Sequence, residues 1–324
     1  MLEECLMAII KNMAGSCSEN GAFYGARRIL AHALPNDRVH SLETLEGGAT
    51  NLNVLVRLEA GDESLVLRQY ARGPEVCRKE TLLLEALQDL LPVPRLVKSD
   101  VTGNEGGIPY LIYRFLPGLT FRQIRAHGSH QDMANAAHAI GRCLGALHNH
   151  DISLLAACRL NQRIQFTEHQ LAHPLLRERI GAADLSLLQQ LFAKWSQFLH
   201  RLAHERSLVH GDFNHRNIVL NYQGDRWEVT GILDWELAGI GSSLWDAARF
   251  VCYQKPDSAH WESHFVDGFR REGGGFFPED WEALSGMMNT LSAAASLAGD
   301  FAQERFVPEL KRLVHAGLRG ERIG

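Results

Sequence analysis

The stretch LVHGDFNHRNIVL, residues 208–220, places three polar side chains, His210, Asp212 and Asn217, between two apolar runs. The flanking LV and IVL runs are short and rich in β-branched residues, which is typical of buried strands. The polar residues between them are therefore expected in a turn that connects two strands. Because this turn carries an acid and an amide five positions apart, it is the first candidate for a ligand site.

A second acid is expected near this turn, at the end of the next apolar run. That run, VTGILDWELAG, contains Asp234 and follows a polar segment, NYQGDR, that is typical of a hairpin turn. Two short strands around the hairpin would bring Asn217, at the start of one, close to Asp234, at the end of the other. Their amide and carboxylate oxygens would converge beside Asp212. Such ligands suit Mg²⁺, which keeps several waters and takes one or two protein carboxylates plus substrate phosphates.

The first third of the chain predicts an antiparallel sheet. Residues 39–70 contain three strand-like runs, joined by a Gly-rich connection and by the tight turn GDE, which together are typical of a meander. Residues 2–13 and 21–33 have helical patterning and form a preface before it. A further helix is predicted over residues 74–91, because a proline suits its first turn and Pro92 follows its end.

This last helix contains an acid on its apolar face. Cys77, Leu84 and Leu87 share one face at helical spacing, and Glu80 lies among them. An ionised carboxylate on a half-buried face needs a cation nearby, because losing its hydration without a partner is costly. Arg68, on the preceding strand, is the candidate partner. The alternative is that Glu80 sits at the edge of the face and reaches water.

The remainder of the chain predicts mostly helices. A strand-like run, IPYLIYRFLPGLTF, leads into Pro117–Gly118, where the chain can change direction, and apolar residues then recur at helical spacing over residues 131–149 and 184–204. A strand-rich first third followed by a helical remainder indicates an α+β fold in two lobes. The expected domains are a helical preface, an N-lobe, a hinge and a helical C-lobe, over residues 1–38, 39–113, 114–118 and 119–324.

Composition excludes several classes of protein. The chain is 45% hydrophobic with a formal net charge of -5, so no general positive field recruits nucleic acid or anionic lipid, and we expect neither as a partner. The six cysteines form no CxxC pair, which indicates reduced thiols in a cytoplasmic protein. The N-terminus lacks the basic start and the length of a signal peptide. The small-residue stretch MMNTLSAAASLAG falls short of the roughly 20 apolar residues of a membrane span.

The pattern HGD-x4-N, followed by a strand that ends in Asp234, resembles the aminoglycoside phosphotransferase and choline kinase family, the small-molecule relatives of protein kinases. The equivalent runs in protein kinases are H-R-D-x-x-x-x-N and D-F-G. The resemblance covers residues 39–250, including GGATNLNVLVRL as the nucleotide loop, LVLRQY as the strand with the phosphate-contacting cation, and LIYRFLPG as the hinge. It implies a protein-kinase-like fold, with a small antiparallel sheet in the N-lobe and a mainly helical C-lobe.

The resemblance also implies a role for each part of this pattern. Asp212 would orient the acceptor hydroxyl or accept its proton, while Asn217 and Asp234 would hold Mg²⁺ as the metal cofactor beside ATP. Arg68 would contact the ATP phosphates and pair with Glu80, which makes the acid on the helix face an expected feature. The remaining nucleotide contacts are implied for the loop over the phosphates and the border of the adenine: Gly47, Gly48, Thr50, Asn51, Tyr113 and Phe115.

Three departures from protein kinases bear on the substrate. Arg68 stands where protein kinases have Lys, and a guanidinium binds phosphate with a different geometry. Gly211 replaces the Arg of H-R-D. Eight residues separate Asp234 from the helix-like SLWDAARFV, which leaves no room for an activation segment, and no A-P-E follows. The expected partner is therefore a small-molecule hydroxyl acceptor, such as an aminoglycoside, an amino alcohol or a sugar.

Two other functions stay open: a nucleotide-binding regulator of the same fold that has lost turnover and, disfavoured by the missing activation segment, a protein kinase. Several residues also have structural interpretations. His210 is expected to fix the turn by a hydrogen bond and Asp246 to tie its helix to the turn. Glu236 is either a metal or substrate contact or a solvated side chain. Five acids are candidates for the acceptor wall and would favour a cationic acceptor if they face it: Glu236, Glu279, Asp280, Asp300 and Glu304.

Overall fold

The computed structural model describes residues 19–45, 51–60, 63–151, 153, 155, 158, 160, 162–202, 206–251, 260–273, 281–299 and 306–320. The predicted helix over residues 2–13 lies outside this set. Contacts divide the chain into two compact units. The first unit consists of residues 1–119 together with Thr230–Glu236, and the second consists of residues 120–229 and 237–324. The short segment that contains Asp234 therefore belongs to the first unit, although most of its neighbours in the sequence belong to the second.

The first unit contains a five-stranded antiparallel sheet with the strand order β1-β2-β3-β5-β4. Its strands are β1 (Val39–Thr44), β2 (Leu52–Leu58), β3 (Ser64–Gln69), β4 (Leu96–Asp100) and β5 (Tyr110–Arg114). The first three strands form the predicted meander, in which Val54 lies opposite Leu67. Strand β3 occupies the middle of the sheet, so its side chains are well placed for burial on both faces.

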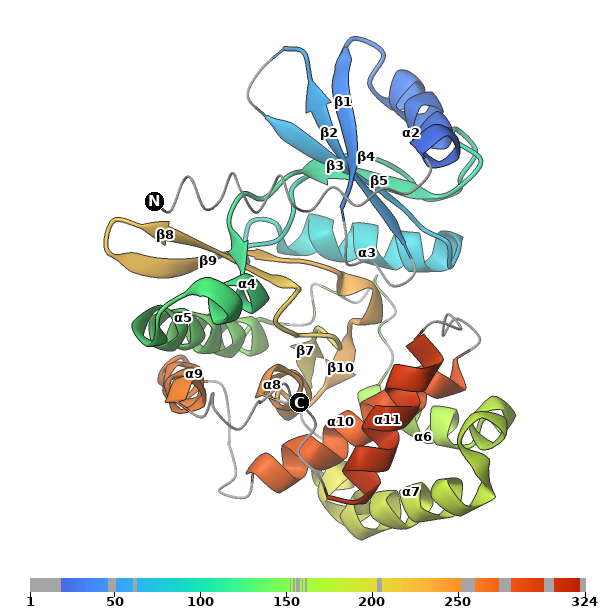
Figure 1. The fold of residues 1–324 in the computed structure, drawn as a ribbon, viewed down its shortest axis with the longest axis vertical. Helices are drawn as coiled ribbons and strands as arrows, with labels where there is room; N and C mark the ends of the chain where they lie inside the picture. Colours follow the sequence, from blue (N-terminus) through green and yellow to red (C-terminus); the bar gives the residue numbers. More distant parts are fainter. Residues whose placement is uncertain are drawn as a thin grey trace. The chain divides into compact units, whose positions relative to one another are not determined.

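Strand alternation gives this sheet two different faces. Helix α2 (Glu19–Ala33) covers one face, where Leu30 and Leu67 belong to one cluster of buried apolar residues. Helix α3 (Pro74–Leu87) lies along the opposite face (Figure 1). Because Arg68 follows Leu67 directly in β3, its side chain leaves the sheet on the α3 side. The alternation of side chains along β3 thus places Leu67 on the α2 side of the sheet and Arg68 on the α3 side.

Two features of this unit differ from the sequence pattern. Strand β4 is not predicted, because it lies at the edge of the sheet with Val97 exposed, and no apolar alternation marks it. The helix predicted over residues 74–91 ends at Leu87. The backbone N–H groups of Leu90 and Leu91 both donate to the Leu87 carbonyl oxygen, which closes the helix in a tight turn before the proline.

Short strands, most of whose residues belong to the second unit, lie on either side of the HGD sequence. These strands are β6 (Leu119–Thr120), β7 (Ser207–Val209), β8 (Ile218–Gln223), β9 (Arg226–Ile232) and β10 (Gly239–Gly241). Strands β7 and β10 pair antiparallel, and β6, β8 and β9 form a three-stranded sheet. The apolar runs around the polar stretch are thus β7 and β8, as predicted. Strands β8 and β9 flank the predicted hairpin turn, and β9 continues past Val229 into the segment of the first unit.

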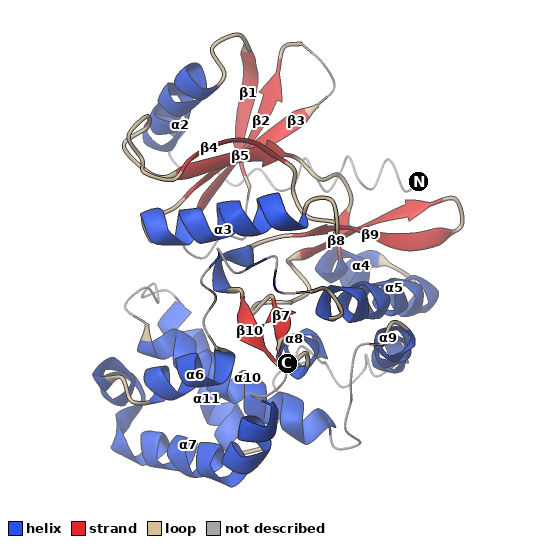
Figure 2. Cartoon of the chain, turned by 180° about the vertical axis from the view of Figure 1, so that it is seen from behind, coloured by secondary structure: helices blue, strands red, loops and turns tan. Residues whose placement is uncertain are grey.

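Most of the second unit is helical, as expected (Figure 2). Its helices are α4 (Phe121–His127), α5 (His130–His148), α6 (Arg163–Leu171), α7 (Pro174–Leu202), α8 (Leu244–Val251), α9 (His260–Arg271), α10 (Trp281–Ala298) and α11 (Val307–Leu318). Helix α5 matches the prediction for residues 131–149. Helix α7 begins earlier than the predicted residue 184 and is interrupted at Gly181, whose φ is 85°. No helix in the described part of the chain is both long enough and apolar enough to cross a membrane.

Helices α5 and α9 pack unusually closely through two glycines. A Cβ at Gly141 of α5 would lie 2.1 Å from the Phe265 carbonyl oxygen, and a Cβ at Gly268 of α9 would lie 2.2 Å from the His138 carbonyl oxygen. No larger residue fits at either position without moving a backbone. This contact fixes the direction of α5, whose last residue is His148.

Candidate active site

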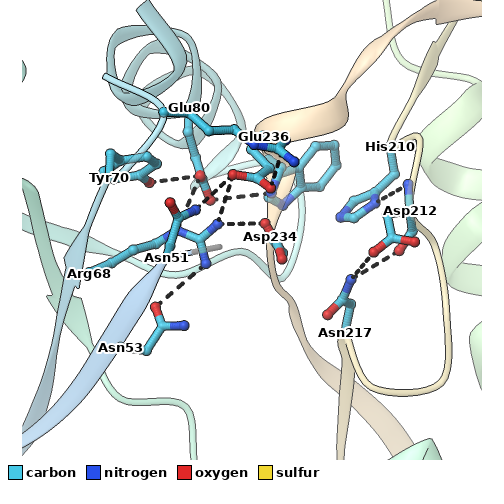
Figure 3. Close-up of polar contacts among 12 residues, drawn as sticks. Asn51, Asn53, Arg68, Tyr70, Glu80, His210, Asp212, Asn217, Asp234 and Glu236 are labelled. Atoms are coloured by element: carbon cyan, nitrogen blue, oxygen red, sulfur yellow. Dashed lines mark hydrogen bonds and ion pairs between the residues drawn. The ribbon is translucent and has the colours of Figure 1, made fainter. Parts of the chain in front are cut away.

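Arg68 of β3 is the centre of a buried group of charges in the first unit. Its Nη2 donates to Asp234 Oδ1 at 2.5 Å, and its Nε lies 3.4 Å from Glu80 Oε2 (Figure 3). The Glu80 side chain is 3% exposed, so the alternative that it reaches water is wrong. Burial alone would lower the pKa of Arg68, but Glu80 and Asp234 raise this pKa well above its ordinary value.

Glu80 also accepts two hydrogen bonds from neighbouring segments. Tyr70 donates its hydroxyl to Glu80 Oε2 at 2.7 Å, and the backbone N–H of Trp235 donates to Oε1 at 3.2 Å. Burial and the charge of Glu80 raise the pKa of Tyr70 well above its ordinary value, so the phenol stays protonated and remains a donor. The segment that contains Asp234 is therefore anchored to the same carboxylate that pairs with Arg68.

Glu236 is the third carboxylate of this group, after Glu80 and Asp234. It accepts a hydrogen bond from Asn51 Nδ2 at 2.7 Å, and its Oε1 lies 3.3 Å from Arg72 Nη1. Its side chain is 10% exposed, so the solvated alternative is wrong. Burial raises the pKa of Glu236, and the charge of Asp234 raises it further. We call this group the Arg68 cluster: Asn51, Arg68, Arg72, Glu80, Asp234 and Glu236.

Asp234 combines backbone strain with an excess of negative charge around it. Its φ of 69° makes it the one described non-glycine residue with a positive φ. Such a conformation costs energy at a non-glycine residue and is often found at functional sites. The Arg68 cluster holds three carboxylates against two guanidiniums, which leaves one negative charge uncompensated within the cluster. A cation bound at Asp234 would compensate it.

In the second unit, Asp246 of α8 holds the turn that contains the HGD sequence. Its carboxylate accepts hydrogen bonds from the backbone N–H groups of His210 and Gly211, at 2.7 and 2.9 Å, and from His148 Nε2 at 3.2 Å. Burial acts to raise the pKa of Asp246, but the hydrogen bonds from His148 and from the backbone N–H of Gly211 lower it overall. The prediction that Asp246 ties its helix to the turn is confirmed.

The backbone of the turn explains the glycine of HGD. Gly211 has a φ of 84°, and a Cβ at this position would lie 2.3 Å from the Leu237 carbonyl oxygen. Neither the conformation nor the space accepts a larger residue. His210 adds a side-chain contact, because its Nδ1 accepts a hydrogen bond from the backbone N–H of Asp212 at 3.2 Å. The predicted structural role of His210 is confirmed.

Asp212 is held by two side chains. Asn217 Nδ2 donates to the Asp212 carbonyl oxygen at 3.0 Å and to its Oδ2 at 3.2 Å (Figure 3). Arg249 of α8 donates to Oδ1 through Nε at 3.1 Å and through Nη2 at 3.0 Å. Because the amide nitrogen of Asn217 faces Asp212, its Oδ1 faces the other way, as an oxygen ligand for a metal requires. We call this group the Asp212 cluster: His148, His210, Asp212, Asn217, Asp246 and Arg249.

His215 connects the turn to the end of α8. Its Nε2 donates to the Phe250 carbonyl oxygen at 2.8 Å, and its Nδ1 accepts a hydrogen bond from Arg125 Nη1 at 2.8 Å. Burial and the charge of Arg125 lower the pKa of His215 well below its ordinary value, so the ring is neutral and keeps these two roles. The ring centroid lies 4.8 Å from that of Phe250 and 5.3 Å from that of Trp261. The turn and α8 are therefore packed as one element.

The predicted catalytic, metal-binding and phosphate-contacting residues fall into two groups. Arg68, Glu80 and Asp234 meet in the first unit, and Asp212 and Asn217 meet in the second. The shared Mg²⁺ site of Asn217 and Asp234 stays a prediction, as do the contacts to ATP. In the part of the chain that the structure describes, no three His, Cys, Asp or Glu side chains form a group that could hold a metal ion. An amide oxygen with one carboxylate is the sparser ligand set that suits a hydrated Mg²⁺.

The predicted nucleotide contacts are described only in part. Tyr113 is buried in β5 opposite Val66, and the backbone N–H of Phe115 donates to the Ser64 carbonyl oxygen at 2.8 Å. Asn51 is buried against Glu236. The other predicted contacts and four of the five acids proposed for the acceptor wall, all except Glu236, lie outside the described residues: Gly47, Gly48, Thr50, Glu279, Asp280, Asp300 and Glu304.

The sequence pattern misses Arg249 and the contact of Asn51 with Glu236. Arg249 lies three positions after Asp246 in the same helix, so the two share a face, and this spacing is the signal that identifies it. The contact between Asn51 and Glu236 has no local signal, because 185 positions separate the two residues in the sequence.

Comparison with known proteins places these observations in one family. Residues 41–286 match the sequence model described as "Phosphotransferase enzyme family", which is more than half of the chain. The chain belongs to this family. Asp212, Asn217 and Asp234 all lie in the matched region of this phosphotransferase-family protein. The resemblance drawn from the HGD pattern is confirmed.

Solved structures similar to the phosphotransferase-family protein share its fold. The GDP and kanamycin complex of APH(2")-IIia has a TM-score of 0.69 at 18% identity and covers 92% of this chain and 99% of that chain. Macrolide 2'-phosphotransferase MphH from Brachybacterium faecium has a TM-score of 0.63 at 21% identity, with 92% and 99% covered. The streptomycin-ATP-APH(2")-IIa ternary complex has a TM-score of 0.62 at 14% identity, with 93% and 97% covered. The predicted α+β, protein-kinase-like fold is thereby confirmed.

Curated relatives of the phosphotransferase-family protein are longer. Acyl-CoA dehydrogenase family member 10 from Mus musculus is 24% identical over 220 residues, which are 65% of this chain and 20% of that protein. Acyl-CoA dehydrogenase family member 11 from Homo sapiens is 26% identical over 225 residues, which are 67% of this chain and 29% of that protein. The chain therefore spans less than a third of the length of these relatives.

Proposed function

We propose that the chain is a phosphotransferase that uses ATP and Mg²⁺ to phosphorylate a hydroxyl group of a small molecule. The observation that supports this most directly is the Asp212 carboxylate, which Asn217 and Arg249 hold at a turn that Asp246 stabilises. A protein that has lost phosphoryl transfer has no need of an acid held in this way. Membership of the phosphotransferase family supports the same reaction.

The two clusters supply different parts of this reaction. Arg68 binds the ATP phosphates, and Glu80 keeps its guanidinium in place. Asp212 accepts a hydrogen bond from the acceptor hydroxyl and orients its oxygen. It takes the proton while the new oxygen–phosphorus bond forms and the bond to the leaving ADP breaks. Because phosphoryl transfer depends mostly on positioning and charge compensation, fixed side chains matter more than a strong base.

The residues present fit a magnesium ion. Asp234 belongs to a cluster with one uncompensated negative charge, and Asn217 turns its amide oxygen away from Asp212. Both oxygens are of the kind that Mg²⁺ takes alongside water and substrate phosphates. When bound, Mg²⁺ neutralises charge on the nucleotide phosphates.

Several classes of hydroxyl compound are candidates for the acceptor. Similar structures contain kanamycin or streptomycin, and one is a macrolide 2'-phosphotransferase, while the longer relatives carry the name acyl-CoA dehydrogenase. Of the five acids that would favour a cationic acceptor, Glu236 is already bound to Asn51 and Arg72. An acceptor panel should therefore include aminoglycosides, a macrolide, amino alcohols, sugars and hydroxylated acyl-CoA thioesters.

Transfer of labelled phosphate from ATP or GTP to this panel, with and without Mg²⁺, tests the proposal. Asp234→Ala should abolish Mg²⁺-dependent nucleotide binding or turnover. Asp225→Ala, at the exposed hairpin turn between β8 and β9, is the matched control and should leave both unchanged. Undiminished activity of Asp234→Ala would remove the metal assignment.

The same assay separates the alternative functions. Nucleotide binding without transfer to water or to any acceptor would favour a silent regulator. Transfer to a protein, with none to small molecules, would favour a protein kinase. Transfer to one class of the panel names the acceptor class directly.

A further inference from the structure

Arg249 holds the Asp212 carboxylate at the oxygen that Asn217 does not contact. Its Nε and Nη2 both donate to Asp212 Oδ1, at 3.1 and 3.0 Å, while Asn217 Nδ2 donates to Oδ2 at 3.2 Å. The side chains of Arg249 and Asp212 are 23% and 25% exposed, so water screens the pair only in part. Charge-assisted hydrogen bonds in such a setting are stronger than those of a fully exposed ion pair.

Side chains on one face of helix α8 bind three consecutive residues of the turn. Asp246 and Arg249 are three positions apart, so they share a helix face. Asp246 accepts hydrogen bonds from the backbone N–H groups of His210 and Gly211. Arg249 binds the side chain of the next residue, Asp212. The helix thus sets the backbone of the turn and the direction of its acid together.

Helix α8 is itself anchored on both sides of Arg249. Ser285 Oγ and Asn289 Nδ2 of α10 donate to the Ala248 carbonyl oxygen, at 2.8 and 2.9 Å. His215 Nε2 donates to the Phe250 carbonyl oxygen at 2.8 Å. Because Arg249 lies between these two carbonyl groups, its backbone cannot shift without breaking buried hydrogen bonds. The Arg249 side chain therefore starts from a fixed backbone position beside Asp212.

These contacts fix the plane of the Asp212 carboxylate. An ionised carboxylate has about four lone-pair directions. Arg249 occupies the Oδ1 side with two donors, and Asn217 occupies one direction at Oδ2. Rotation of the carboxylate would break both sets of bonds. One direction at Oδ2 then stays available for the acceptor hydroxyl.

We propose that Arg249 is a positioning residue for phosphoryl transfer, which holds Asp212 Oδ1 so that Oδ2 meets the acceptor hydroxyl in one orientation. This role rests on the proposed function. Because Arg249 acts through Asp212, its loss affects the rate of the chemical step and leaves substrate binding unchanged. A displacement of about 1 Å at a reacting group can lower a rate by about 10²-fold.

Two other roles for Arg249 make different predictions. An arginine that binds the nucleotide phosphates would raise the KM for ATP when it is removed. An arginine that binds an anionic group of the acceptor would raise the KM for the acceptor. In both cases the kcat at saturating substrate would change little.

Arg249→Met tests these roles, because it removes the charge and keeps much of the side-chain volume. We expect kcat to fall by about 10- to 100-fold, with both KM values within about threefold of the wild type. Arg249→Lys keeps the charge but loses the guanidinium fork, and should have an intermediate kcat. Arg142→Met removes an exposed partner of Glu272 in the same unit and is the matched control, with wild-type kinetics expected.

Three measurements separate positioning from loss of the fold. Thermal unfolding of each variant reports the fold directly. Guanidinium chloride, far below denaturing concentrations, should raise kcat of Arg249→Ala several-fold by filling the space beside Asp212, and should not affect Arg142→Ala. In an Asp212→Asn background, Arg249→Met should lower kcat by less than about threefold, because a residue that acts through Asp212 then has little left to position.

The possible results distinguish this role from the proposed function. Wild-type kcat in Arg249→Met, a raised KM with unchanged kcat, or equal losses in the two backgrounds would each overturn the positioning role and leave the proposed function intact. Absence of transfer by the wild-type protein to water and to every acceptor would overturn both.

Discussion

The Arg68 cluster and the Asp212 cluster both bury carboxylates, but they compensate them differently. In the Arg68 cluster, three carboxylates share two guanidiniums, and the pKa of Glu236 is raised by burial and by the charge of Asp234. In the Asp212 cluster, each carboxylate has donors of its own. Asp246 accepts from two backbone N–H groups and from His148, and its pKa is lowered.

The two clusters show two ways to stabilise carboxylates inside a protein: with donors of their own, or with guanidiniums that several acids share. Backbone donors are placed by the fold and stabilise a carboxylate whether or not a ligand is bound. Guanidiniums shared among several acids leave negative charge that a further cation can compensate. The carboxylates of the Asp212 cluster are therefore compensated by protein groups alone. The Arg68 cluster has excess negative charge, which a bound cation would compensate.

Removing the charge of Asp246 should cause the largest loss of stability, because its carboxylate holds the turn of the Asp212 cluster. Asp246→Asn places an amide against two backbone donors and His148, and should lower the free energy of unfolding by about 3–5 kcal/mol, as for other broken buried pairs. Asp267→Asn, at a half-exposed acid of α9, should change it by less than about 0.5 kcal/mol. Denaturant unfolding at neutral pH measures both. Equal stability of Asp246→Asn and the wild type would mean that the turn does not depend on this charge.

The pH dependence of the stability difference between the wild type and Asp246→Asn tests whether the pKa of Asp246 is lowered in the folded state. Because the folded-state pKa of Asp246 is lowered, its stabilisation is fully present above the ordinary aspartate pKa of about 3.9 and is lost as the pH falls through the folded-state pKa. The stability difference between the wild type and the variant should therefore shrink in acid. A difference that stays constant into strongly acidic solution would contradict the lowered pKa.

Asp212→Asn should have the next largest effect. This effect should appear in the rate of phosphoryl transfer and not in ATP binding. We expect kcat to fall by about 10²-fold or more, which corresponds to about 2.7 kcal/mol, as for the loss of a positioned base. ATP affinity, measured by titration calorimetry, should stay nearly unchanged. Asp225→Asn, on the exposed turn, serves as the control. Comparable turnover in Asp212→Asn and the wild type would mean that the base lies elsewhere.

Glu80→Gln tests whether the Arg68 cluster depends on its paired acid. The change removes the charge that faces Arg68 and should lower the free energy of unfolding by about 1.5–3 kcal/mol, the range for hydrogen bonds to charged groups. Glu85→Gln, at an exposed position of the same helix, should have an effect below about 0.5 kcal/mol. If the two variants were equally stable, Glu80 would contribute no more than a surface acid.

Glu236→Gln should have the smallest effect on the free energy of unfolding, and it should raise this free energy at neutral pH. Because the folded-state pKa of Glu236 is raised, its ionised form destabilises the fold, and this penalty grows as the pH rises from the ordinary glutamate pKa of about 4.3 to the folded-state pKa. The variant should therefore be more stable than the wild type at neutral pH and lose this advantage in acid. Glu59→Gln, at an exposed position, controls for a general charge effect. Lower stability at neutral pH would show that Arg72 and Asn51 compensate the buried charge fully.

Parts of the molecule that depend on local spacing are predictable from the sequence. The meander over residues 39–70, helix α5 and the strands around the HGD turn all follow from the positions of apolar residues a few places apart. The pairing of Arg68 with Glu80 is predictable as well, because an acid on a buried helix face needs a cation. Strand β4 is not predictable in this way, because an exposed edge strand carries no apolar alternation.

The sequence by itself therefore determined the fold class, the HGD turn as the candidate site and the buried pair of the first unit. Only the tertiary structure decided which side chains share those acids. Arg249 reaches Asp212 across 37 positions, and Asn51 reaches Glu236 across 185. Such contacts arise when packed segments bring distant residues together, and the spacing of neighbouring residues holds no information about which segments will meet.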